Sequence, residues 1–514
     1  MTKIRKLFSN SVSGGAAKFL NALIQLVSLP ILLKVYGKEG YGLLAIAMSF
    51  NTFIAILQLG LPAGIPKFVA EWIAKKDYSI MQKATSSVFS FYLVLAFINL
   101  ALILIVRYFF VDYFKISIEQ AVIFKELLII TAIVSFISIP LNYLDQLLSG
   151  VQEIVFISKQ QMFKNLMFAC LVLFVFLKPN SLTLVQFYSI NCLIMLAFIP
   201  SKIKKWLKYG TLKTFIPKWY FKEILPLLKY CLQLFIMGLF IMMADKLKPL
   251  ILSLRASNDA AVKMADYQII YNVVMFLGMI AASIIAALIP YVSGEYILGN
   301  SEIYKKVIQN VTKPVWAFGA FVVFIMILLS NELLVIYVGP ANLYLRKWLI
   351  LFLIGSLYIL YTPCISAVVL ASGKTSQYTI GTAVACLVSL AVCWFLVPIT
   401  AMGGMIYAFI VYIFILFSVV HFYYLRRIFG ISPVNQITKV FLPPIAAGIC
   451  MLLCIRYLLD LLNIANPYSN VFVGTITGSL LYSAIILVIY IKPKDVKLYF
   501  NHIIFSQTLN DRKI

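Results

Sequence analysis

Polar side chains at helical spacing interrupt the long apolar segments of this 514-residue sequence. Within residues 12–36, Lys18, Asn21 and Gln25 lie three and four residues apart, which places an ammonium and two amides on one stripe of a helix. An ammonium attracts phosphate by charge, and amides hydrogen-bond hydroxyl groups. This stripe is therefore a candidate binding surface for an anion that carries hydroxyls.

The segment 225–254 carries a second set of polar residues. Lys229, Gln233 and Lys246 share one face of a helix, because separations of four and seventeen residues both return to within about 40° of the start at about 100° per residue. Asp245 points nearly the opposite way. We expect its carboxylate either to neutralise a lysine of a neighbouring helix or to titrate.

A third polar run, around Asp266, completes the candidate site. The amides and tyrosines of this run could bond sugar hydroxyls, as could Tyr358 and Tyr361. An interfacial aromatic belt is the alternative explanation for the tyrosines. The candidate binding residues are Lys18, Asn21, Gln25, Lys229, Gln233, Lys246, Gln268 and Asn272, and the candidates for ion coupling are Asp245 and Asp266.

The depth of these groups in the apolar segments indicates whether they line a binding site or reach the membrane surface. An ionisable side chain at the centre of a bilayer costs about 2.5–3.5 kcal/mol on insertion scales, so it normally faces a bundle interior or a wet cavity. Near a helix end, a lysine stem can instead reach back to the interface, which is the alternative for Lys34, Lys164 and Lys248. Both explanations stay open for Lys18 and Lys229.

Signatures of enzymes are nearly absent. The histidines His421 and His502 have no evident partner nearby in the sequence, and we expect both to be solvated or interfacial. Ser372 to Thr375 imitates the end of a phosphate-binding loop, but Val368 stands where that loop requires glycine. All eight cysteines lie in apolar segments, and the sequence has no paired-carboxylate motif. We expect no catalytic site, metal or cofactor.

The elements that must position these residues are membrane helices. The composition is 63% hydrophobic and 12% charged, with a mean hydropathy of +0.98. Continuous apolar runs of about twenty residues, such as 12–36, 41–64 and 225–254, are each long enough to cross a bilayer. We count about fourteen, and their continuity excludes barrel strands. The predicted fold is all-α, a polytopic membrane protein.

The net charge of +25 is explained by topology rather than by nucleic acid binding. More than half of the 43 Lys and Arg residues fall in the N-terminal tail, in the even-numbered loops and in the C-terminal tail. By the positive-inside rule, both termini are cytoplasmic and the number of spans is even.

The most basic loop divides the chain into lobes. Trp206 and Trp219 stand among its lysines, so we expect it to lie along the anionic lipid surface, although a plain topological signal is equally compatible. The expected plan is an N-terminal lobe of six helices (1–201), a basic cytoplasmic linker (202–224), a C-terminal lobe of six helices (225–425), a cytoplasmic loop (426–439), two extra helices (440–491) and a cytoplasmic tail (492–514).

Three glycine-rich motifs resemble those of a known family. They are Ser13-Gly14-Gly15 with Lys18, the turn Val35-Tyr36-Gly37 followed by Gly40-Tyr41-Gly42, and the run Leu59-Gly60-Leu61-Pro62-Ala63-Gly64-Ile65-Pro66. The first eighty residues are similar to Wzx-type polysaccharide (O-antigen or capsule) flippases of the MOP exporter superfamily.

The resemblance implies two six-helix lobes that enclose a cationic cavity and alternate between inward-open and outward-open states. It implies a bacterial inner membrane protein that moves an undecaprenyl-pyrophosphate-linked oligosaccharide to the periplasmic leaflet. We expect polysaccharide polymerase machinery as a partner, and either a proton or sodium gradient or consumption of the flipped lipid as the source of net direction. Arginine is common in the cavities of that family, whereas the deep cations here are lysines.

Three other functions remain open. A peptidoglycan-precursor flippase has the same plan. A MATE-like exporter of cationic compounds would want a carboxylate-rich cavity, which the lysines argue against. A membrane glycan polymerase or ligase would need a sizeable outer loop with catalytic residues, and the sequence contains no such loop.

Overall fold

The computed structural model of the chain describes residues 3–58, 60–114, 116–256, 259–297, 302–372, 376–462 and 466–490. These residues form helices, and the described part contains no β-strand, so the predicted all-α fold is confirmed. The chain divides into two compact units. Unit 1 is Met1–Met279 with Thr375–Leu416, and unit 2 is Ile280–Lys374 with Phe417–Ile514.

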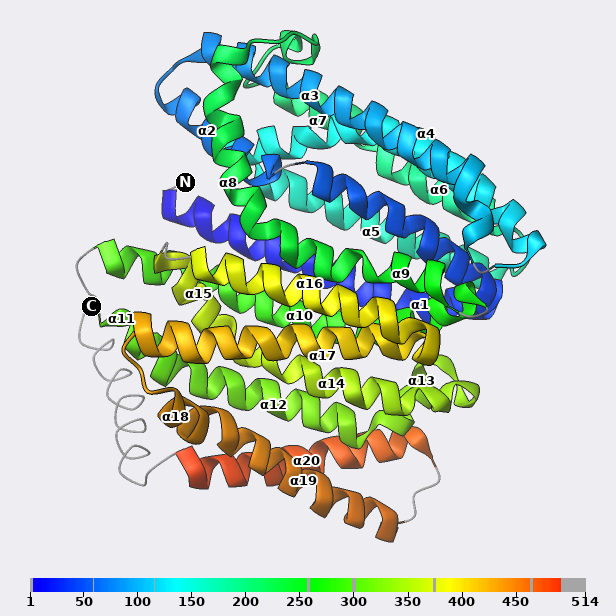
Figure 1. Cartoon of the computed structure of the whole chain (residues 1–514), viewed down its shortest axis with the longest axis vertical. Coiled ribbons are helices and arrows are strands. Elements are labelled where there is room, and N and C mark those ends of the chain that lie inside the picture. Colours follow the sequence, from blue (N-terminus) through cyan, green and yellow to red (C-terminus); the bar gives the residue numbers. More distant parts are fainter. Residues whose placement is uncertain are drawn as a thin grey trace, which may run out of the picture. The chain divides into compact units, whose positions relative to one another are not determined.

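Unit 1 combines the N-terminal helices with two helices that come much later in the chain. They are α1 (Lys3–Leu57), α2 (Leu61–Ala74), α3 (Tyr78–Ile105), α4 (Ile118–Gly150), α5 (Ile154–Leu177), α6 (Leu184–Ala197), α7 (Ile199–Trp206), α8 (Phe221–Lys246), α9 (Lys248–Arg255), the first half of α10 (Ala260–Ile297), α16 (Ser376–Thr400) and most of α17 (Met402–Ser418). In Figure 1, α3 and α4 run side by side, and α16 packs on α8 and α9.

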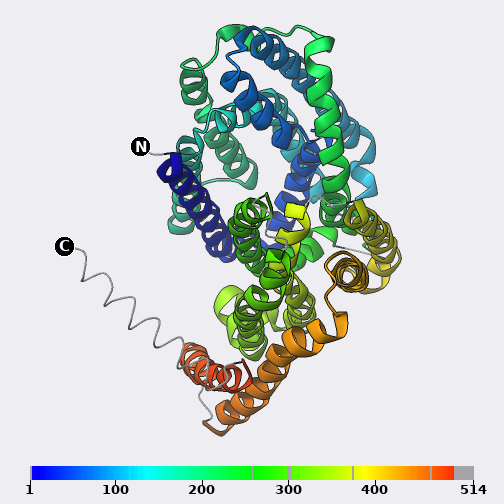
Figure 2. The same ribbon diagram turned by 90° about the vertical axis from the view of Figure 1, so that its left-hand side faces the viewer.

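Unit 2 holds the rest of α10 and the later helices. They are α11 (Ile303–Lys306), α12 (Thr312–Leu328), α13 (Ser330–Val338), α14 (Arg346–Tyr361), α15 (Pro363–Ser372), α18 (Pro433–Gln436), α19 (Leu442–Leu462) and α20 (Pro467–Tyr490). The hydroxyl of Tyr482 on α20 donates to the carbonyl of Ala317 on α12 at 2.9 Å. Figure 2 shows α19 and α20 (orange and red) packed against each other within this unit.

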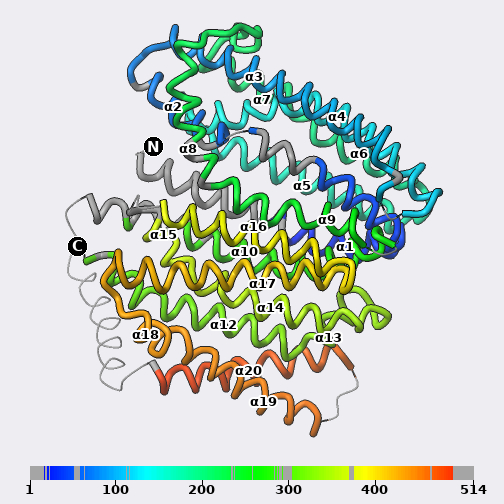
Figure 3. Tube along the Cα trace, viewed as in Figure 1, coloured from blue at the N-terminus to red at the C-terminus, as the bar shows by residue number. Residues whose placement is uncertain are grey.

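α1 is two helices joined at Gly37. A straight helix of 55 residues would be about 80 Å long, far more than a bilayer thickness. Gly37 has φ 70° and ψ 174°, a conformation that glycine adopts without steric cost, and the helical hydrogen bonding breaks there. In Figure 3 the dark blue tube doubles back beside the α1 label. The predicted spans 12–36 and 41–64 lie on either side of this turn.

Eleven helical segments of the described part are long and apolar enough to cross a membrane. This confirms a polytopic membrane protein. The predicted spans 12–36, 41–64 and 225–254 are not among the eleven, although they fall on the helices α1, α2, α8 and α9. The count of fourteen therefore stays a prediction.

The basic segment after α6 folds onto α3 and α4. The Trp206 side chain is fully buried, and its indole Nε1 donates to Thr214 Oγ1 at 3.4 Å. The backbone amide of Tyr220 donates to Ser87 Oγ on α3 at 2.7 Å. The prediction that Trp206 lies along the lipid surface is wrong, because its ring fills the core between these helices, whereas Trp219 is exposed.

Glycines bring α1 and α2 into backbone contact with α8 and α10. A Cβ at Gly42 would lie 1.8 Å from the carbonyl oxygen of Ala261, near the start of α10. A Cβ at Gly64 on α2 would lie 2.2 Å from Cys231 Sγ and 3.7 Å from Cys231 Cβ on α8. No side chain fits at Gly42, because it would meet the backbone of Ala261, and a side chain at Gly64 fits only if the Cys231 thiol moves.

The Gly64 contact predicts a cross-link with a native thiol. In Gly64→Cys, the two Cβ atoms would be 3.7 Å apart, close to the mean of about 3.8 Å in disulfides, so we expect a disulfide with Cys231 after mild oxidation. Thiol labelling followed by gel shift measures it. Gly238→Cys on α8, which has open space around its Cβ, is the control and should stay reduced. Equal labelling of the two oxidised variants would contradict this packing.

Candidate transport site

α10 contributes a buried carboxylate that pairs with α1. The Asp266 side chain is 1% exposed, and its Oδ1 lies 2.8 Å from the ammonium of Lys38, which is 27% exposed. Lys38 directly follows the turn at Gly37, and this turn places the Lys38 ammonium beside α10. Next to it, Glu39 Oε2 accepts from Gln120 Nε2 on α4 at 2.9 Å. Two polar contacts thus hold this end of α1 on its neighbours.

A second carboxylate links α8 to α10. Both oxygens of Asp245 lie 3.1 Å from the hydroxyl of Tyr271, which donates to them. The ammonium of the neighbouring Lys246 lies 2.8 Å from Asp245 Oδ2. The predicted partner of Asp245 was a lysine of a neighbouring helix, whereas the lysine that pairs with it is Lys246 of α8 itself. Lys248 is buried nearby, with its ammonium 5.6 Å from the Phe409 ring centre, and the snorkelling alternative for Lys248 is excluded.

The amides of α10 follow Asp266 along the same helix. Gln268 Nε2 donates to Asn272 Oδ1 at 3.0 Å, and the Asn272 side chain also hydrogen-bonds Tyr41 on α1. Gln268 and Asn272 are partly buried and occupy successive turns of one face. α10 therefore contacts α1 through Asp266 and Asn272, and it contacts α8 through Tyr271.

The other predicted residues join this network less clearly. Gln25 Nε2 donates to Asn21 Oδ1 at 3.4 Å, so the predicted stripe on α1 exists at these two positions. Lys229 is exposed on α8. The side chains of Lys18 and Gln233 lie outside the described residues, although both positions are helical. Whether the eight binding candidates surround one substrate stays a prediction.

Sequence reasoning missed Lys38 as a partner of Asp266. The two residues are 228 positions apart, and no local spacing joins them. The available signal was the charge itself: an aspartate in an apolar helix needs a cation, and Lys38 stands in a glycine-rich turn that places it at a helix end.

His421 in unit 2 is the clearest wrong prediction. It is fully buried in the π-helical segment η6 (Val419–Ile428), not solvated. Its Nδ1 lies 2.9 Å from the carbonyl of Phe417 and its Nε2 lies 3.1 Å from the hydroxyl of Tyr361. Because a carbonyl only accepts, Nδ1 carries the proton and the Tyr361 hydroxyl donates to Nε2. Tyr361 is accordingly core rather than an interfacial belt residue.

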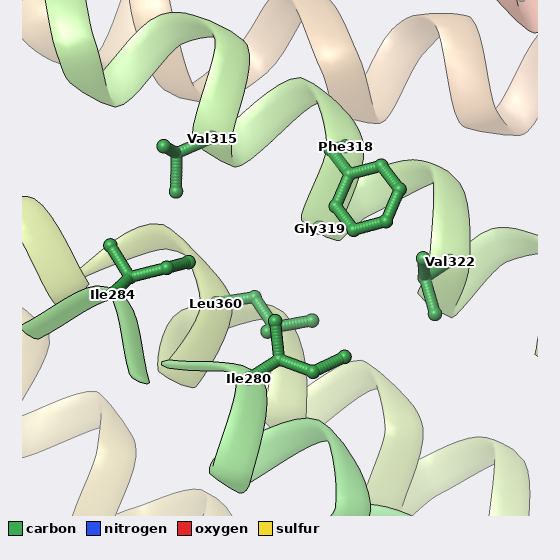
Figure 4. Close-up of a pocket in the computed structure, with 7 residues that line it drawn as sticks. All are labelled: Ile280, Ile284, Val315, Phe318, Gly319, Val322 and Leu360. Atoms are coloured by element: carbon green, nitrogen blue, oxygen red, sulfur yellow. The ribbon is translucent and has the colours of Figure 1, made fainter. Parts of the chain in front are cut away.

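Unit 2 also contains a small apolar pocket, shown in Figure 4. Its walls come from α10, α12 and α14 and carry no ionisable group; they are Ile280, Ile284, Val315, Phe318, Gly319, Val322 and Leu360. The polar candidates of unit 1 are therefore not part of it.

Comparison with known proteins identifies the class of fold. The structure is similar to the lipid II flippase MurJ in an inward closed conformation, with a TM-score of 0.70 and 16% identity over 93% of this chain and 99% of that chain. It is also similar to an inward-facing multidrug resistance MATE family transporter of the MOP superfamily, with a TM-score of 0.61 and 15% identity over 77% and 92%. The fold is that of MOP superfamily transporters.

The family follows from the sequence. Residues 7–294, more than half of the chain, match the model of the polysaccharide biosynthesis protein family, Polysacc_synt. The chain belongs to this family. A third similar structure is a MOP superfamily transporter from Pyrococcus furiosus, with a TM-score of 0.60 and 14% identity over 84% of this chain and 96% of that chain. No curated protein matches the chain.

The pair between Lys38 and Asp266 predicts an asymmetric effect of mutation. Lys38→Met should lower the free energy of unfolding by about 3–5 kcal/mol, because it leaves the buried carboxylate without this cation. The reversal Lys38→Asp with Asp266→Lys should recover part of that loss. Thermal unfolding in detergent measures both variants.

The matched control for this pair is Lys83→Met. Its ammonium lies 3.5 Å from Glu223 at a more exposed position, and the change should cost about 1 kcal/mol or less. Two outcomes would contradict a buried pair. One is a reversed protein that loses as much stability as Lys38→Asp and Asp266→Lys lose together when measured singly. The other is a Lys38→Met protein that is as stable as Lys83→Met.

Proposed function

We propose that this chain is a Wzx-type flippase that moves a polyprenyl-pyrophosphate-linked oligosaccharide from the cytoplasmic to the periplasmic leaflet of a bacterial inner membrane. The observation that carries the proposal is the match of residues 7–294 to the polysaccharide biosynthesis family on a MOP fold. A glycan that is assembled on a lipid must cross the membrane, and a fold of this class can provide the route.

The polar network of α1, α8 and α10 supports an anionic, hydroxylated cargo. Lys229 supplies an exposed ammonium on α8, and Gln268 and Asn272 supply amides on α10. In an apolar surrounding, an ammonium attracts a pyrophosphate strongly, and amides can replace the water that hydrates sugars. The pyrophosphate and glycan would pass through the protein while the polyprenyl tail stays in lipid.

In the proposed alternating-access mechanism, the lobe of residues 1–201 moves relative to the lobe of residues 225–425. The network joins α1 of the first lobe to α8 and α10 of the second, so opening between the lobes would have to break these contacts. Asp245 and Asp266 are the proposed coupling residues, because protonation of either carboxylate would weaken its bond to Lys246 or to Lys38. A proton or sodium gradient would then drive the cycle, and a polysaccharide polymerase would receive the product.

A peptidoglycan-precursor flippase is the second candidate, favoured by the similarity to MurJ over nearly the whole of both chains. The two candidates carry related cargoes with a pyrophosphate and sugars but differ in the peptide. A comparison of cargoes in one assay separates them.

The decisive experiment is flipping in proteoliposomes. Purified protein should expose a polyprenyl-pyrophosphate oligosaccharide on the opposite leaflet faster than it exposes lipid II, and an ion gradient should change the rate. Lys229→Gln, Lys18→Gln and Lys246→Gln should each lower the rate about tenfold with normal insertion, which corresponds to a barrier raised by about 1.4 kcal/mol.

The control is Lys178→Gln, an exposed lysine just after α5. Its rate should equal that of the wild type. Unchanged rates in all three cavity variants would remove these lysines from the transport site. Faster exposure of lipid II than of the oligosaccharide would favour the second candidate, and glycan polymerisation by the pure protein would support an enzyme.

A further inference from the structure

Three helices of unit 1 enclose a polar cluster that the transport site does not use. The ammonium of Lys202 on α7 lies 2.6 and 2.7 Å from the two carboxylate oxygens of Asp145 on α4, and the Lys202 side chain is only 5% exposed. The ammonium of Lys164 on α5 lies 5.9 Å from the ring centre of Phe198, the residue directly before α7. Asp145 is paired with Lys202, so the cluster holds two lysines for one carboxylate, which is an excess of positive charge.

Two buried amides of α5, four residues before Lys164 and directly after it, each leave one polar atom without a partner among the described residues. Gln160 Nε2 donates to Ser201 Oγ, and because the Ser201 hydroxyl itself donates to the carbonyl of Phe198 at 2.7 Å, it can only accept from Gln160. Asn165 Oδ1 accepts from Gln161 Nε2 at 3.2 Å. Gln160 Oε1 and Asn165 Nδ2 have no partner among the described residues, although the two side chains are 7% and 6% exposed.

The other charged residues nearby do not neutralise the excess positive charge of this cluster. Glu153 is engaged by Lys205 at 3.1 Å and by the hydroxyl of Tyr209, and this hydrogen bond raises the pKa of Tyr209 to about 12. Lys204 and Lys208 add exposed positive charge on and just after α7. A basic cluster between helices at this end attracts anionic headgroups.

The polar atoms without a partner indicate which chemical groups a bound molecule would carry. An anion would pair with Lys164 and accept from Asn165 Nδ2, and a hydroxyl would donate to Gln160 Oε1. Gln160 and Lys164 are four residues apart and share one face of α5. Water would satisfy the amides but not the charge, and a cation would meet like charge. A phosphate ester that carries a hydroxyl matches all three groups.

The surroundings favour a lipid as the source of this phosphate. Phe163 and Met167 lie within about 100° of Lys164 around α5 and are exposed, so acyl chains can pack on them. The Asp145 side chain is 37% exposed, so the cluster can be reached from the surface of the unit. We propose that α4, α5 and α7 form a binding site for the hydroxylated phosphate headgroup of an anionic glycerophospholipid, held by Lys164, Asn165 and Gln160.

This site is independent of the proposed cargo. It uses none of the residues assigned to transport, and it would hold its lipid whether or not the chain moves a glycan. Binding can therefore fail while flipping succeeds, and the reverse, which keeps the two proposals distinguishable.

The test is lipid binding to the full-length protein in detergent, followed by native mass spectrometry. Phosphatidylglycerol should bind at least tenfold more tightly than phosphatidylcholine with the same acyl chains. Lys164→Met should weaken phosphatidylglycerol binding about tenfold, and Asn165→Leu should weaken it in the same direction. Lys159→Met is the matched control, because Lys159 is exposed on another face of α5, and it should leave binding unchanged.

A soluble arm identifies the source of the phosphate. If glycerol 1-phosphate competes with the lipid in the wild type but not in Lys164→Met, the headgroup alone is recognised. If it does not compete and the preference for phosphatidylglycerol is retained, the acyl chains are also required. Either result supports the site. Equal binding of phosphatidylglycerol to wild type, Lys164→Met and Asn165→Leu, or no preference over phosphatidylcholine, would overturn it.

Discussion

Charge placed inside an apolar helix bundle must be neutralised by a partner, and this requirement shapes unit 1. Asp266 is almost completely buried, and its nearest cation comes from the turn in α1. Asp245 is met by Lys246 and by the hydroxyl of Tyr271. α10 therefore carries both the carboxylate that pairs with Lys38 of α1 and the hydroxyl that donates to Asp245 of α8.

Close packing makes these contacts possible. Gly42 brings α1 onto the first turn of α10, and Gly64 brings α2 onto α8 at Cys231. The same glycines that belong to the family-like motifs of the sequence therefore have a local physical role, which is to remove side chains where two helices touch. Short polar contacts between α1 and α10 follow from this spacing.

The sequence predicted what depends on composition and missed what depends on distant contacts. Continuous apolar runs and charge asymmetry were enough for an all-α, polytopic membrane protein. The pairing of Asp266 with Lys38 spans 228 residues and carries no periodic signal. Burial of His421 and of Trp206 depends on neighbouring rings and helices that a single segment does not reveal, and a basic flanking sequence suggested the opposite for Trp206.

A MOP fold alone does not choose a cargo, because one fold can serve many substrates and the sites decide between them. The proposed cargo requires an ammonium-rich route that prefers a pyrophosphate. The most direct measurement compares binding of polyprenyl pyrophosphate and of the uncharged polyprenol with the same tail. It should be made in Lys164→Met protein, in which the α4, α5 and α7 site contributes less. The account predicts binding of the pyrophosphate at least tenfold tighter at low salt, with the difference shrinking as salt is added. Equal affinities for the two lipids at every salt concentration would contradict it.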